Sequence, residues 1–206
     1  SGKKDRIPSS STQGNPKCLV LDSNDCIYTS GKHYNDNVSP SDTESHTIMK
    51  HTELGHLVWQ RDIGGADGNI NAVSEGGINE FPRGIAMHGD YIYTTGNGGL
   101  SATSSYLFKY NKTTGDLEWK KTLSKGLKSI ATDSSGNLYG VSDYTTGTGL
   151  NTTYYGFICK FDSSGSITWQ KSLQHLLAIS RIIIDSSDNI YICGRQQINT
   201  PSSQPA

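Results

Sequence analysis

The chain of 206 residues is long enough to bury a core of its own or to form part of a larger repeat array. Its formal net charge of −1 and its pI near 6.6 exclude the strongly basic surface that nucleic-acid-binding proteins use. No apolar run approaches the ~20 residues that a membrane helix requires. We therefore expect neither nucleic-acid binding nor insertion into a membrane.

One short pattern recurs along the chain and organises the rest of it. The pattern begins with a lysine, ends with a tryptophan, and carries a glycine four residues before that tryptophan. It occupies residues 50–59, 109–119 and 160–169. Self-similarity with a period of about 40 to 50 residues is typical of propellers and solenoids.

A second pattern fixes the register of the repeat. An aspartate ends one Ile/Val-rich run, and a tyrosine in the next run follows it six residues later. Asp, Asn, Ser and Gly between the runs supply turn chemistry, so each copy predicts a β-hairpin. The pairs are Asp22 with Tyr28, Asp133 with Tyr139, and Asp185 with Tyr191; a version shortened by one residue has His88 in place of the aspartate and ends at Tyr93.

Two hairpins per repeat give four short strands, which is what a propeller blade needs. In the third repeat we expect strands near 129–133, 137–142, 155–161 and 167–173, and no segment shows convincing helical periodicity. The sequence therefore predicts an all-β protein, a β-propeller of four-stranded antiparallel blades with about three and a half blades in this chain. The expected parts are a flexible lead-in or linker at 1–17, blade 1 at 18–63, an inserted loop at 64–82, blade 2 at 83–126, blade 3 at 127–175, and the first half of blade 4 at 176–206.

The two patterns together carry a resemblance to a known repeat. Residues 133–139 with residues 160–169 resemble the bacterial SBBP repeat family, whose members are seven-bladed β-propellers. Residues 109–119 also resemble the tryptophan motif of pyrroloquinoline-quinone-type propeller repeats. The resemblance covers roughly residues 18–194 and implies blade architecture, whereas propellers host many unrelated activities.

Only the first hairpin of the fourth repeat is recognisable, and an incomplete blade would expose an unpaired strand edge. The expectation is a fragment of a longer propeller. Two alternatives stay open: two copies of the chain close one seven-bladed ring, or a partner protein covers the half-blade. The polar start at Ser1 has no apolar signal-peptide core, and its origin stays open as well.

Long polar loops at 31–45, 96–105 and 143–154 each follow the strand that bears the repeated tyrosine. They are expected to emerge on one face of the blades, where repeat proteins usually bind their ligands. The candidate binding residues on these loops are His33, Tyr34, Asn35, Asp36, Asn97, Tyr144, Asn151 and Tyr154.

Other candidate chemistry has a structural explanation that we favour. The recurring aspartates fit turn capping better than catalysis or calcium binding. The recurring tryptophans Trp59, Trp119 and Trp169 fit packing between blades better than sugar stacking. His46, His51 and His56 are spaced by five residues, which alternates the faces of a strand and disfavours a metal site.

The four cysteines are too few for a disulfide scaffold. Pairing residue 21 with residue 26 across the first turn would put Cys18 and Cys26 on opposite faces of the sheet. We expect buried free thiols, and a bridge between Cys159 and Cys193 stays open.

No motif of a nucleophile elbow, a phosphate loop or a zinc protease occurs, so the sequence predicts neither an enzyme nor a cofactor. It favours a non-enzymatic structural or recognition module of a surface-exposed or virion assembly. Such a module would bind a protein partner or a surface glycan through its loops, at an extracellular, cell-surface or virion location. The alternatives are a quinoprotein-like or lyase-like propeller enzyme, and an assembly scaffold that self-associates or is completed by a neighbouring chain.

Overall fold

The computed structural model describes residues 14–34, 44–63, 81–98, 104–146, 153–173 and 176–196. Every regular element within these ranges is a β-strand, so the all-β prediction is confirmed. The chain divides into two units, Ser1–Leu127 and Lys128–Ala206, each of which has its own sheets.

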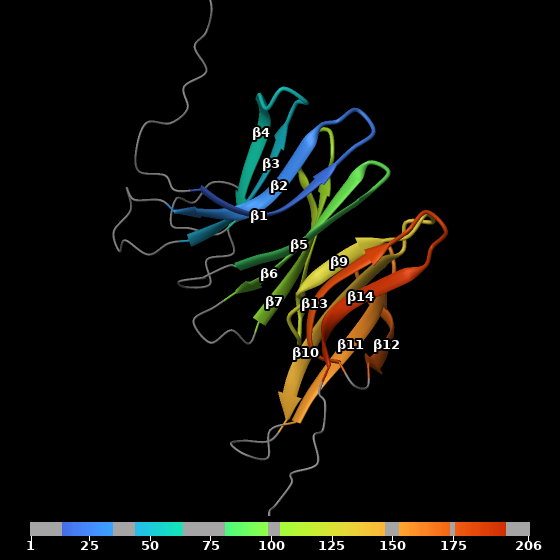
Figure 1. The fold of residues 1–206 in the computed structure, drawn as a ribbon. Helices are drawn as coiled ribbons and strands as arrows, with labels where there is room; N and C mark the ends of the chain where they lie inside the picture. The colour runs from blue at the N-terminus through green and yellow to red at the C-terminus, as the bar shows by residue number, and fades with distance from the viewer. Residues whose placement is uncertain are drawn as a thin grey trace, which may run out of the picture. The chain divides into compact units, whose positions relative to one another are not determined.

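The first unit contains two four-stranded antiparallel sheets whose strands lie in sequence order, blue to teal and then green to yellow-green in Figure 1. The strand β1 begins at Gly14, so the lead-in is shorter than the predicted 1–17. The first sheet holds β1 (Gly14–Leu21), β2 (Ile27–Tyr34), β3 (Glu44–His51) and β4 (Leu57–Ile63). The second holds β5 (Phe81–His88), β6 (Tyr91–Gly98), β7 (Ser104–Asn111) and β8 (Leu117–Leu123).

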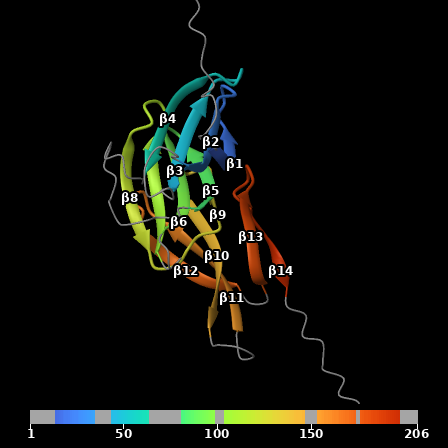
Figure 2. The same cartoon turned by 90° about the vertical axis from the view of Figure 1, so that its left-hand side faces the viewer.

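The second unit contains one four-stranded antiparallel sheet and one separate hairpin. The sheet is formed by β9 (Ser129–Thr132), β10 (Leu138–Thr146), β11 (Thr153–Phe161) and β12 (Ile167–Leu173). Its strands match the four that the sequence predicts, although β10 runs beyond residue 142. The hairpin is formed by β13 (Leu176–Ile184) and β14 (Ile190–Gln196), which lie side by side in Figure 2.

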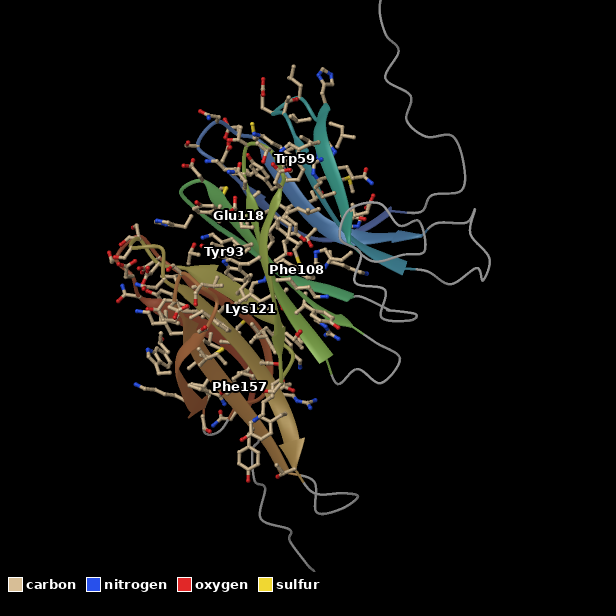
Figure 3. The ribbon with its side chains drawn as sticks, turned by 180° about the vertical axis from the view of Figure 1, so that it is seen from behind. Trp59, Tyr93, Phe108, Glu118, Lys121 and Phe157 are labelled. Carbon is tan, nitrogen blue, oxygen red and sulfur yellow. The ribbon has the colours of Figure 1, made fainter. Side chains whose placement is uncertain are left out.

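The core of the first unit lies between its two sheets. Side chains alternate between the faces of a strand, so only every second residue reaches this layer. The first sheet contributes Tyr28, Ile48 and Trp59, and β7 contributes Tyr106, Phe108 and Tyr110 to the same buried cluster. Trp59 and Phe108 are labelled within this layer in Figure 3. A single sheet cannot hide an apolar face unaided, so the two sheets stabilise each other.

The core of the second unit forms in the same way between its sheet and its hairpin. Tyr139, Val141 and Ile158 pack against Ile179 and Ile182 of β13. Trp169 of β12 is partly buried against this cluster. The predicted role of the tryptophans in packing between blades is confirmed for Trp59, whose indole lies against Gly115 of the second sheet.

A row of paired side chains crosses each complete sheet at its second, third and fourth strands. Tyrosine, lysine and tryptophan are direct cross-strand partners in it, and we call it the tyrosine–lysine–tryptophan row. The rows are Tyr28–Lys50–Trp59, Tyr93–Lys109–Trp119 and Tyr139–Lys160–Trp169. The tyrosine and tryptophan ring centroids are 6.2, 6.2 and 6.0 Å apart. The lysine ammonium lies 5.3, 5.8 and 5.3 Å from the tyrosine centroid, within the range of a cation–π contact.

The predicted register of the first hairpin is wrong by one residue. Leu21 pairs with Ile27, and Cys18 pairs with Ser30. A slip of one residue moves a side chain to the other face of a strand. Cys18 and Cys26 consequently pack against the same cluster instead of lying on opposite faces. All four cysteines are free thiols, but the predicted burial holds for Cys159 alone, because Cys18 and Cys26 are half-buried and Cys193 is exposed.

Candidate functional site

The predicted binding residues fall on strand ends and on segments beyond them. His33 and Tyr34 are at the end of β2, and Asn97 in β6 pairs with Ser105. Tyr144 in β10 and Tyr154 in β11 belong to the same hairpin. Three of the predicted residues lie outside the described part of the chain: Asn35, Asp36 and Asn151.

Tyr144 is the predicted binding residue for which the structure gives contacts. It is the cross-strand partner of Tyr155, a residue that the sequence reading missed. The two rings are stacked, with centroids 5.3 Å apart and planes 21° apart. Tyr144 is half-buried, whereas Tyr155 is 39% exposed. This Tyr144–Tyr155 pair therefore forms an accessible aromatic surface near the ends of β10 and β11.

One buried ring packs against the Tyr144–Tyr155 pair, and the residue before Tyr144 is held by two hydrogen bonds. Phe157 is 2% exposed, and its ring lies 6.1 Å from that of Tyr144. The neighbouring Asp143 carboxylate accepts hydrogen bonds from the Lys128 ammonium and from the Ile179 backbone N–H, the latter at 3.1 Å. The Lys128 ammonium therefore compensates the charge of the carboxylate next to Tyr144 in the sequence.

The repeated aspartates cap their turns, as the sequence predicts. The Asp133 carboxylate accepts hydrogen bonds from the backbone N–H of Ser135 at 3.1 Å and of Asn137 at 2.8 Å. It also accepts one from the Tyr139 hydroxyl at 3.1 Å. The tyrosine link recurs between Tyr28 and Asp22 and between Tyr191 and Asp185. The constant spacing of six residues was the signal for this link, and the sequence reading used it only to set the register.

The turn environment changes the acidity of these carboxyl groups. Partial burial raises the pKa of Asp133, but the hydrogen bonds from Asn137 and Tyr139 outweigh it and hold the pKa below its ordinary value. The Asp185 pKa is lowered mainly by the hydrogen bonds from Asn189. These carboxylates therefore remain charged at neutral pH and accept their hydrogen bonds from within their own turns.

Ser30 and His46 have the geometry of a nucleophile and its base, but neither residue is accessible to a substrate. The Ser30 hydroxyl oxygen and the His46 Nε2 atom are 2.9 Å apart. Both residues are 0% exposed, and the His46 ring lies 5.2 Å from that of Phe108. Burial lowers the pKa of His46 to about 4, so the imidazole is neutral at physiological pH. No substrate can reach the pair in this conformation.

The histidines of the 46–56 segment do not converge. His46 is buried, His51 is half-buried and His56 is exposed. Within the described ranges, no group of three or more His, Cys, Asp or Glu side chains is arranged to hold a metal ion. The same ranges contain no helix that is long and apolar enough to cross a membrane.

Four-stranded antiparallel sheets in sequence order, packed face against face within a unit, define the class of fold as a β-propeller. No protein-family model matches the chain, and no characterised protein sequence matches it. Solved structures do match in fold. A variant of Synechocystis apocarotenoid oxygenase gives a TM-score of 0.56 at 10% identity over 93% of this chain. Kuenenia stuttgartiensis hydrazine synthase gives 0.52 at 10% identity over 86% of this chain.

The chain spans only part of these neighbours, 46% of the oxygenase and 61% of the hydrazine synthase. The prediction of a non-enzymatic structural or recognition module is wrong on this comparison, because the structures that share the fold are enzymes. At this level of identity the likeness shows a shared propeller fold and not an activity.

Proposed function

We propose that this chain forms part of a propeller of the enzyme-bearing kind and that its own role is to bind a flat, apolar substrate at the Tyr144–Tyr155 pair. The observation that carries the proposal is the stacked pair itself, with Tyr155 39% exposed near the end of its strand. Strand ends and the loops beyond them are where a rigid scaffold usually presents its binding residues.

The chemistry of the pair favours a conjugated or aromatic ligand. Tyrosine rings offer a large apolar face, and an offset-stacked ring contact contributes about 0.5–1.5 kcal/mol beyond the burial of area. The buried Phe157 beneath Tyr144 fixes one ring, so less side-chain entropy is lost on binding. Apocarotenoids, after which one fold neighbour is named, are conjugated and apolar and so belong to the class of ligand that stacked tyrosine rings favour.

The test is a titration of the full chain with all-trans-retinal, an apocarotenoid aldehyde, followed by its absorption band and by quenching of protein fluorescence. We expect saturable binding and a loss of affinity of about two- to tenfold in Tyr155→Ala, which is the range of one ring contact. The matched control is Tyr191→Ala, because Tyr191 is an exposed tyrosine of the same unit at 53% exposure. That variant should bind retinal like the unchanged chain.

Two results would overturn the proposal. One is the absence of saturable binding by a chain whose circular dichroism is that of a folded β protein. The other is an equal loss of affinity in Tyr155→Ala and Tyr191→Ala, which would mean that retinal adheres to any exposed ring.

A further inference from the structure

The two tyrosines of the Tyr144–Tyr155 pair face each other, which distinguishes them from the tyrosines of the repeat. Tyr28, Tyr93 and Tyr139 each lie against a tryptophan. Tyr144 and Tyr155 are instead direct cross-strand partners, with ring centroids 5.3 Å apart and planes 21° apart. The register of β10 against β11 therefore holds two phenol rings in contact.

Facing phenol rings have a specific chemistry when they lose electrons. A tyrosine that loses one electron and its hydroxyl proton becomes a phenoxyl radical, whose unpaired electron is shared with the two ring carbons beside the hydroxyl group. Two such radicals in contact join through these carbons. Cross-strand partners have β-carbons about 4.5–5.5 Å apart, so the strands keep the two rings together before oxidation begins. Reacting groups that are held together in this way have a high effective concentration.

One ring of the pair is accessible, and the other is held by a buried neighbour. Tyr155 is 39% exposed, so an oxidant in solution can reach its ring. Tyr144 is half-buried, and the buried ring of Phe157 lies 6.1 Å from it. We therefore expect Tyr155 to be oxidised first. Once Tyr144 has reduced that radical, renewed oxidation of Tyr155 completes the pair of radicals.

We propose that Tyr144 and Tyr155 are a site of oxidative cross-linking, at which a haem peroxidase with hydrogen peroxide joins the two rings as dityrosine. Each tyrosine loses one electron and one proton, and a carbon–carbon bond forms between the ring positions next to the two hydroxyl groups. The hydrogens on the joined carbons move to the oxygens, which restores both phenols. One hydrogen peroxide molecule accepts the two electrons and two protons and becomes two water molecules. The modification fastens β10 to β11 and requires no bound ligand.

The test treats the full chain with a haem peroxidase and hydrogen peroxide, after the exposed Cys193 has been alkylated because thiols consume radicals. Rings held in contact have an effective concentration of roughly millimolar or more, so linking within one chain dominates at about 1 μM protein. Trypsin leaves residues 129–160 as one peptide, since no lysine or arginine lies between Lys128 and Lys160. We expect this peptide to lose two hydrogens in mass, to show dityrosine fluorescence, and to give no backbone fragments between positions 144 and 155.

Phenylalanine variants locate the bond, because phenylalanine keeps the ring but has no hydroxyl proton to lose. Tyr144→Phe and Tyr155→Phe should each abolish the linked 129–160 peptide. The matched control is Tyr154→Phe, since Tyr154 is the neighbouring residue on β11 and pairs with Thr145 instead of Tyr144. That variant should form the link like the unchanged chain. A parallel reaction with N-acetyltyrosine shows that the oxidant is active.

The proposal fails on any of three results. One is a 129–160 peptide of unchanged mass under conditions that convert N-acetyltyrosine to its dimer. Another is a linked peptide that persists in Tyr155→Phe, since the bond would then join other rings. The third is a yield that rises with protein concentration, which would mean that separate chains are joined. The cross-link is measured without retinal and retinal binding is measured without oxidant, so this proposal and the proposed function fail separately.

Discussion

The indole of Trp59 occupies the space that a side chain at Gly115 would need. A β-carbon on Gly115 would lie 2.8 Å from Cδ2 of Trp59, closer than such atoms approach in proteins. Gly115 also has a positive φ of 76°. Nearby, the Arg61 guanidinium donates a hydrogen bond to the Thr114 carbonyl oxygen, so the turn that contains Gly115 is docked on the first sheet at two points.

Replacing Gly115 by alanine should destabilise the first unit by about 2–4 kcal/mol. The positive φ contributes roughly 1–2 kcal/mol of this, and displacement of the indole contributes about as much again. The measurement is the free energy of unfolding in urea, followed by tryptophan fluorescence.

Gly55 is the matched control, because it holds the same position in its own repeat and has a φ of 81°. A β-carbon there would meet nothing within 4 Å. Gly55→Ala should therefore show only the backbone effect of roughly 1–2 kcal/mol. Equal losses in the two variants would contradict the close contact with Trp59.

The turn aspartate and its tyrosine should contribute unequally in the second unit. Asp133→Ala removes the acceptor for two backbone N–H groups and for the Tyr139 hydroxyl, and we expect a loss of about 1–3 kcal/mol. Tyr139→Phe removes the hydroxyl bond alone and should lose about 1 kcal/mol. Urea unfolding at pH 7 measures both losses, and a larger loss in Tyr139→Phe would be inconsistent with capping as the main role of Asp133.

The same aspartate predicts a pH dependence. Its folded-state pKa is below the ordinary value of 3.8, so the stabilisation is fully present above that value and is lost as the pH falls through the folded pKa. The difference in stability between the unchanged chain and Asp133→Ala should therefore shrink below pH 3.8. A difference that stays constant down to pH 2 would argue against the charged form as the capping species.

His46 predicts a second pH dependence in a different window. Its folded pKa of about 4 lies below the ordinary 6.5, so the unfolded chain binds the proton more readily between these values. Stability should fall with acidification from pH 6.5 toward 4, by about 3 kcal/mol in total from a shift of this size. The double variant His46→Leu with Ser30→Ala should lose this dependence, and an unchanged slope would rule out the buried imidazole as its source.

The cysteines should differ strongly in reactivity. Burial raises the pKa of Cys159 to about 12, and its thiol donates a hydrogen bond to the Gly140 carbonyl oxygen. Cys193 is exposed. Iodoacetamide at pH 8 should label Cys193 more than about tenfold faster than Cys159 in the folded chain, with the sites read by peptide mass spectrometry. Comparable rates without unfolding would contradict the burial of Cys159.

The architecture could be predicted from the sequence because each residue that recurs in the repeat has one dominant structural role. The glycine before each tryptophan allows a positive φ, as at Gly55, Gly115 and Gly165, and the recurring aspartate caps its turn. Turn chemistry of this kind can be recognised from the sequence alone. The register of Cys18 could not be predicted in this way, because the turn after Leu21 contains one more residue than the predicted turn.

The candidate site was harder to predict than the fold. The sequence predicts Tyr144 as a binding residue because it lies near the start of a polar loop, but its stacking partner Tyr155 lies beyond that loop on the next strand. Their meeting depends on the register of β10 against β11, which no local pattern specifies. The Ser30–His46 pair was missed for the same reason, since the two residues are cross-strand neighbours with no recognisable motif.

Each strand in the described part of the chain pairs only with the strands that immediately precede or follow it in the sequence. Closing such short loops involves little loss of chain entropy, and pairing of this kind accelerates folding. A ribosome releases the chain from its N-terminal end, so each hairpin can form as soon as its second strand has emerged. Strand pairing can therefore proceed one hairpin at a time during synthesis, whereas the buried cluster forms once the sheet that packs against it has emerged.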